Sequence, residues 1–124
     1  MQFKECYQNP FIEERADPYI TLGPDGFYYF TASYPMKSAD DKDGYDRVIL
    51  RRAKDISELA SAEEITIWKV ADTTLTHRFI WAPELHYIAG RWYVFYAGSE
   101  DKENNWAFDC HVLVCDSDDP YTGT

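Results

Sequence analysis

The chain has 124 residues, enough for one ordinary domain, and its apolar share of 45% and aromatic share of 17% are too high for a disordered protein. Its formal net charge of −10 repels phosphate backbones and anionic lipids, so we expect neither a nucleic acid nor a membrane surface as partner. A neutral carbohydrate fits better, because carboxylates accept hydrogen bonds from hydroxyls and aromatic rings stack on sugar faces.

The sequence contains no apolar run as long as a membrane span, and its first ten residues, MQFKECYQNP, lack the apolar centre of a signal peptide. Three cysteines, an odd number, argue against a disulfide framework. The sequence as it stands therefore predicts a cytoplasmic protein, with secretion as the alternative if a signal peptide has been removed.

In chain order, apolar periodicity predicts strands at residues 18–22, 27–34, 47–52, 64–70, 84–88, 91–97 and 109–115. The segment Gly23-Pro24-Asp25-Gly26 predicts a hairpin turn between the first two strands. Residues 54–64 form at most a short helix, with Asp55 as its N-cap. The predicted fold class is all-β.

The sequence also repeats itself. DPYITLGPDGFYYFTAS aligns with APELHYIAGRWYVFYAG through one gap, so that Pro18 matches Pro83, Gly26 matches Gly90 and Phe30 matches Val94. The strands of both units are apolar on both faces and must be covered on both, as in the blades of a β-propeller. We predict about two propeller blades; the alternative is a β-sandwich that contains two similar hairpins.

Two blades cannot close a ring, since propellers have about four to eight. We therefore expect residues 1–124 to be the N-terminal portion of a larger domain, with blade one at about 10–70 and an incomplete blade two at about 79–124. The apolar faces of such end blades would be uncovered, which predicts self-association of the isolated chain.

Asp17 is the first candidate for chemistry, because it stands at the mouth of the first strand, where burial of a carboxylate would be costly. Alternation places Asp17 and Tyr19 on one face. In the second unit Ala82 aligns with Asp17, Trp81 precedes it and Glu84 follows. Carboxylates beside an indole are the groups that glycoside hydrolysis requires. The alternative for Asp17 is a turn residue that caps the strand before Pro18.

Four stretches, NPFIEERADPYI, DGFYYFTAS, YDRVILRRAKDISELASAEEITIW and WAPELHYIAGRWYVFYAG, resemble glycoside hydrolase family 43. The resemblance covers roughly residues 9–124 and is strongest to the exo-acting α-L-arabinofuranosidases that trim 1,5-linked arabinan. It implies a five-bladed β-propeller that hydrolyses terminal α-L-arabinofuranosyl linkages of arabinan-type oligosaccharides with inversion.

The resemblance matches Asp17 to the general base of the family. The general acid, a Glu, and a third carboxylate, an Asp, belong to later blades, so it implies that this chain alone is inactive. Trp81 is expected to stack on substrate, or else to pack between blades. Glu84 is expected to bind a sugar hydroxyl, or else to pair with Arg15 or Arg78.

Two functional alternatives stay open: a β-xylosidase or arabinoxylan-debranching enzyme of the same family, and a non-catalytic carbohydrate-binding fragment. We expect no cofactor. His77, His86 and His111 are not spaced as a metal set, so no metal ligand is assigned, although propellers of the family often hold a central cation in the full-length protein.

Overall fold

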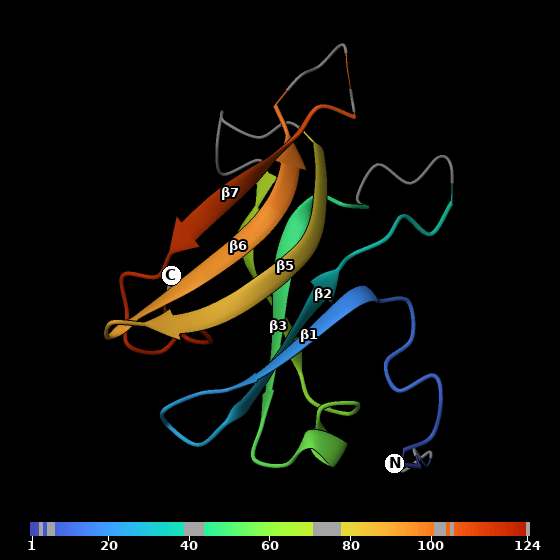
Figure 1. Ribbon diagram of the computed structural model, residues 1–124, viewed down its shortest axis with the longest axis vertical. Helices are drawn as coiled ribbons and strands as arrows, with labels where there is room; N and C mark the ends of the chain where they lie inside the picture. The colour runs from blue at the N-terminus through green and yellow to red at the C-terminus, as the bar shows by residue number, and fades with distance from the viewer. Residues whose placement is uncertain are drawn as a thin grey trace.

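The computed structural model describes residues 1–2, 4, 7–38, 44–70, 78–100, 104 and 106–123, which form two antiparallel sheets (Figure 1). The first sheet has the order β1-β2-β3-β4 and the second the order β5-β6-β7. The strands are β1 (Ala16–Leu22), β2 (Tyr28–Ser33), β3 (Arg47–Ala53), β4 (Glu64–Lys69), β5 (Arg78–Ile88), β6 (Arg91–Ser99) and β7 (Phe108–Val114). All seven predicted strands are present, and the all-β prediction is confirmed.

Between β3 and β4 lies the 3-10 turn η1 (Ile56–Glu58). Asp55 caps it: its carboxylate accepts from the Ser57 N–H at 2.8 Å, and the Asp55 N–H donates to Glu58 at 3.3 Å. The predicted N-cap is therefore confirmed. Among the described residues, no helix has the length and apolar character needed to cross a membrane.

The internal repeat is visible in the strand pairing. Ile20 pairs with Phe30 in the first sheet, and their sequence counterparts Leu85 and Val94 pair in the second. Ala16 pairs with Ser33 as Trp81 pairs with Ala97. The two hairpins thus have the same register, as the sequence alignment predicts. Whether each sheet is one blade of a propeller, and how many blades there are, stays a prediction.

Both β1 and β5 contain a bulge at the X-Pro step. The register shifts between Ala16 and Tyr19 in β1, and between Trp81 and Glu84 in β5, so at this step each strand carries one residue more than its partner. β5 has a second shift, between Arg78 and Trp81. Proline lacks an N–H and ordinarily ends a strand, which is why the predicted strands began at Pro18 and just after Pro83. The bulge lets β5 continue through Pro83, back to Arg78. It also means that strict alternation does not hold between Asp17 and Tyr19.

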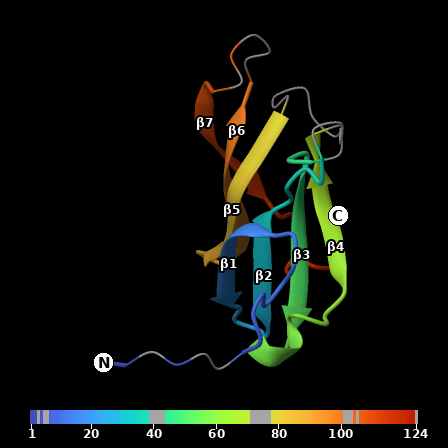
Figure 2. The ribbon, with the colours of Figure 1, turned by 90° about the vertical axis from the view of Figure 1, so that its right-hand side faces the viewer.

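Each face of the first sheet is covered, as its apolar strands require. On one face Tyr29, Val48 and Leu50 pack against Leu85 and Trp92 of the second sheet. Figure 2 shows the two sheets face to face and the N-terminal segment running across the opposite side of β1–β4. That side holds a second buried cluster, which the N-terminal segment and η1 complete with Phe11, Ile12 and Ile56 around Phe30, Ile49 and Leu59.

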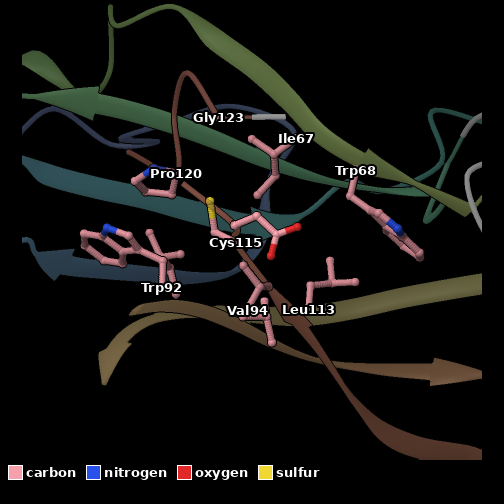
Figure 3. Close-up of a pocket in the computed structure, with 11 residues that line it drawn as sticks. Ile67, Trp68, Trp92, Val94, Leu113, Cys115, Pro120 and Gly123 are labelled. Carbon is pink, nitrogen blue, oxygen red and sulfur yellow. The ribbon is translucent and has the colours of Figure 1, made fainter. Parts of the chain in front are cut away.

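The C-terminal segment that follows β7 forms hydrogen bonds with both sheets. Arg52 of β3 binds the Asp119 carboxylate at 2.8 Å, and the Trp92 indole N–H donates to the Asp118 carbonyl at 3.1 Å. Between the sheets lies a cavity of about 210 Å³ with a mainly apolar lining that includes Ile67, Trp68 and Leu113 (Figure 3). Asp17, Trp81 and Glu84 do not line this cavity, which we interpret as part of the packing between the sheets.

Candidate active site

Asp17 lies in the bulge of β1 with a left-handed backbone (φ 50°), and it is exposed. Such a φ is uncommon for residues other than glycine, and Asp tolerates it better than most. The carboxylate Oδ2 accepts a hydrogen bond of 2.8 Å from the Ser33 hydroxyl. Within the described chain no group donates to Oδ1, and no backbone N–H caps the carboxylate. Asp17 is thus an exposed carboxylate held at one oxygen, and the turn-capping alternative is not what the structure contains.

Ser33 links this carboxylate to the second sheet. Its side chain is fully buried at the end of β2, and its hydroxyl also accepts a hydrogen bond of 2.8 Å from the Ala82 N–H. Sequence reasoning missed Ser33, because a serine at a strand end has no distinctive pattern. One signal was present: the aligned position in the second unit is Ala97, so the hydroxyl appears only in the unit that has the carboxylate.

The segment that leads into Asp17 is anchored by charge. The Arg15 guanidinium forms two hydrogen bonds with the Glu64 carboxylate of β4, and Arg51 of β3 binds Oε2 of the same carboxylate at 3.0 Å. The Arg15 guanidinium also lies over the Tyr34 ring, 4.3 Å from its centroid. Burial alone would raise the pKa of Glu64, but the hydrogen bonds and charges of Arg15 and Arg51 outweigh it, so its pKa lies below the ordinary 4.5.

Trp81 is the centre of an aromatic cluster at the start of β5. Its ring stacks on Phe108 of β7 at 4.5 Å and makes edge contacts with Tyr45, Phe79 and Trp106 at 5.7–5.9 Å. Trp81 is half-buried, and its indole nitrogen is buried without a hydrogen-bond partner in the described chain. Trp106 is 78% exposed. The structure therefore shows the packing role of Trp81, and its role as a sugar-stacking wall stays a prediction.

Glu84 is exposed and accepts from, or pairs with, His86 Nε2 at 3.0 Å. The other ring nitrogen of His86 lies 3.4 Å from the Tyr19 hydroxyl of β1. The alternative pairing of Glu84 with Arg15 is wrong, because Arg15 is taken by Glu64. The side chain of Arg78 lies outside the described residues. Glu84 also lines an open groove of about 400 Å³ on the second sheet, together with Phe95, Phe108 and others.

The structure brings the three predicted site residues to the region where β1 and β2 pack against β5. The link runs from Asp17 through Ser33 to the backbone of Ala82, which Trp81 precedes directly and Glu84 follows by two residues. None of the three predicted side chains contacts another among the described interactions. The region thus combines an exposed carboxylate, an aromatic cluster and a polar pair, which suits a ligand rich in hydroxyls.

The donor set does not fit a central cation by itself. Both ring nitrogens of His86 have protein neighbours, and His77 lies outside the described residues. In the part of the chain that the structure covers, no three His, Cys, Asp or Glu side chains are grouped as metal ligands would be.

Comparisons with known proteins agree with these features. The chain is 42% identical over 118 residues to an extracellular exo-α-(1→5)-L-arabinofuranosidase of Streptomyces avermitilis, covering 95% of this chain and 23% of that protein. It is equally similar to the enzyme of the same description from Streptomyces chartreusis, of which it covers 33%. The chain therefore spans about a quarter to a third of the length of these two relatives.

Among solved structures, the α-L-arabinofuranosidase of Lactobacillus brevis superposes with a TM-score of 0.75 and 39% identity, covering 94% of this chain and 35% of that one. Residues 7–124 match the family described as glycosyl hydrolases family 43. The match extends over nearly the whole chain and includes every element that surrounds Asp17. The resemblance seen in the sequence motifs is confirmed, and the chain belongs to glycosyl hydrolases family 43.

Proposed function

We propose that the protein containing this chain hydrolyses terminal α-L-arabinofuranosyl linkages of arabinan or arabino-oligosaccharides with inversion, and that Asp17 is its general base. The observation that carries the proposal is the geometry of Asp17, an exposed carboxylate fixed at Oδ2 with Oδ1 open. The relatives named as arabinofuranosidases support the choice of substrate.

In this mechanism Oδ1 of Asp17 accepts a proton from a water molecule as the water oxygen bonds to the anomeric carbon. The glycosidic C–O bond breaks on the opposite face, and a general acid protonates the departing oxygen. A general base must be ionised and within reach of water, and an exposed carboxylate at a strand bulge satisfies both needs. An inverting pair stands about 6.5–9.5 Å apart to admit this water.

We assign the general acid to no described residue of this chain. Glu84 is the other carboxylate among the predicted site residues, but it aligns with Tyr19 rather than with Asp17, and its carboxylate is engaged by His86. The family resemblance assigns the acid and a third carboxylate to later blades. Residues 1–124 alone should therefore bind substrate weakly at most and show no turnover.

Trp81 and Glu84 are proposed to shape the pocket for the terminal sugar. The indole would supply an apolar wall, and the Glu84–His86 pair would supply hydrogen bonds to hydroxyls. The partner in this proposal is a carbohydrate alone. The two Streptomyces relatives are named extracellular, and we propose secretion for this protein too, in place of the cytoplasmic expectation.

Release of sugar by the full-length protein tests the proposal. We expect arabinose from 1,5-linked arabino-oligosaccharides and little xylose from xylobiose. The first product observed by proton NMR should have the anomeric configuration opposite to that of the substrate linkage. Preferential release of xylose would establish the β-xylosidase alternative, and a product with retained configuration would exclude Asp17 as a base in an inverting reaction.

A further inference from the structure

The hydroxyl of Ser33 connects the candidate base to the neighbouring sheet. It donates to Asp17 Oδ2 and accepts from the Ala82 N–H, both at 2.8 Å, and the side chain is fully buried. A hydroxyl carries one proton. Since a backbone N–H can only donate, its approach leaves the Ser33 proton to point at the carboxylate. The direction of the hydrogen bond is therefore fixed from the second sheet.

The two bulges make this bridge possible. In β5 the bulge takes Ala82 out of the pairing with β6, so its N–H is available to Ser33. In β1 the bulge turns Asp17 into the left-handed region, where its carboxylate meets the same hydroxyl. The second sheet repeats the bulge with Ala82 and Ala97 in place of Asp17 and Ser33. The first sheet thus has both the carboxylate and the hydroxyl, and the second sheet has neither, although both sheets have the same bulge.

We propose that Ser33 is a positioning residue for the general base, and that the Ala82 N–H of the second sheet orients the Ser33 hydroxyl. The hydroxyl holds Oδ2, so the carboxylate is oriented with Oδ1 toward the position of the attacking water. Correct packing of the two sheets then becomes a condition for a competent base. This inference rests on the proposed role of Asp17.

Thr31 offers a matched control for Ser33. It lies two residues earlier on the same face of β2 and is 1% exposed, and its hydroxyl has no hydrogen-bond partner in the described chain. Thr31→Val removes a buried hydroxyl of the same strand without breaking such a bridge. Ser33→Thr and Ser33→Val form a second pair, since they have the same shape and differ by the hydroxyl alone.

The experiment compares these variants in the full-length protein on 1,5-linked arabino-oligosaccharides. We expect Ser33→Ala to lower kcat about ten- to hundredfold with KM within about twofold, as for loss of a hydrogen bond to a charged group that does not touch substrate. Thr31→Val should keep the kcat of the unchanged protein. The kcat of Ser33→Thr should exceed that of Ser33→Val by a similar factor. If Ser33→Ala does not fold, this pair decides whether the Ser33 hydroxyl positions the base.

Asp17→Asn separates the two proposals. If it abolishes turnover while Ser33→Ala or Ser33→Val keeps wild-type kcat, the role of Ser33 is overturned and the base assignment stands. Equal losses in Thr31→Val and Ser33→Ala would also overturn it, because they would reflect packing. If Asp17→Asn keeps wild-type activity, the assignment of Asp17 as general base fails, and the role of Ser33 fails with it. In the double variant, adding Ser33→Ala to Asp17→Asn should cause no further loss.

Discussion

Asp17 and Ala82 occupy equivalent positions in the two sheets, and both have a left-handed backbone, with φ of 50° and 46°. Each precedes a proline and forms the bulge of its strand. The same backbone device thus serves two purposes: the first bulge presents a carboxylate, and the second presents an N–H to the Ser33 hydroxyl that holds this carboxylate.

The conformation of Ala82 leads to a prediction about stability. Positive φ is strongly disfavoured for β-branched residues, so Ala82→Val should lower the free energy of unfolding by about 1–3 kcal/mol. Ala82→Gly should change it by less than about 1 kcal/mol, since relief of strain offsets the added freedom of the unfolded chain. Urea unfolding of the full-length protein measures both. Ala82 is exposed, so steric overlap in the core does not confuse the comparison.

Removal of the charge at Asp17 should abolish most of the activity. A positioned general base contributes about 10²–10⁴-fold, and Asp17→Asn should lower kcat by that factor without a large change in melting temperature. Asp118→Asn is the control, since it removes the charge of another exposed aspartate. Equal activity of the two variants on arabino-oligosaccharides would show that Asp17 is not the base.

Glu64 should make stability depend on acidic pH. Because its pKa is lowered in the folded protein, the carboxylate stabilises the fold above its ordinary pKa of 4.5, and this contribution is lost as pH falls through the folded value. At neutral pH, Glu64→Gln should cost about 1–3 kcal/mol, as it weakens the bonds to Arg15 and Arg51. The difference between variant and wild type in urea unfolding should shrink below pH 4.5. A difference independent of pH would contradict the lowered pKa.

The strand pattern and the repeat could be predicted from sequence because both depend on local periodicity. Ile20 and Leu85 align by sequence and pair with equivalent partners in the structure. The start of β5 could not be predicted, because Pro83 reads as a strand boundary and only the bulge lets the strand pass it. Bulges depend on backbone geometry, which residue alternation does not encode.

For the site, the sequence indicated Asp17 through its family motif and its place before a proline. It could not indicate Ser33, because the role of Ser33 arises from the packing of β2 against β5, two strands that lie far apart in the chain. Nor could the sequence identify the partner of Glu84. Arg15 has the opposite charge and was a plausible partner, but in the structure it pairs with Glu64 of β4. Ion-pair choice is a tertiary property.

Trp81 and Trp106 should differ in their effects on stability. Trp81 stacks on Phe108 at 4.5 Å and contacts three other rings, so Trp81→Ala should lower the free energy of unfolding by about 2–4 kcal/mol. Trp106 is 78% exposed, and Trp106→Ala should cost less than about 0.5 kcal/mol. Thermal unfolding tests this. If the Trp81 ring also stacks on the terminal sugar, Trp81→Leu should raise KM for arabino-oligosaccharides even at temperatures where the variant is fully folded.

The last prediction concerns the 124-residue chain on its own, which we expect to self-associate. β7 is an edge strand of its sheet, and its outward side chains Val112 and Val114 are 51% and 44% exposed. An open edge beside exposed apolar side chains is a template for pairing with a second copy. Sedimentation should show dimers or larger species that grow with protein concentration.

A charge placed at this edge should oppose the association. Val112→Glu adds a carboxylate to the outward face of β7 and makes the formal net charge of −10 more negative, so sedimentation should shift toward monomer. Thr66→Glu is the matched control, because Thr66 is exposed on β4, an edge strand of the other sheet. If Thr66→Glu dissociates the chain as well, net charge rather than the β7 edge governs association. A wild-type chain that stays monomeric at every concentration would mean that the electrostatic repulsion of this acidic protein outweighs its exposed apolar strand.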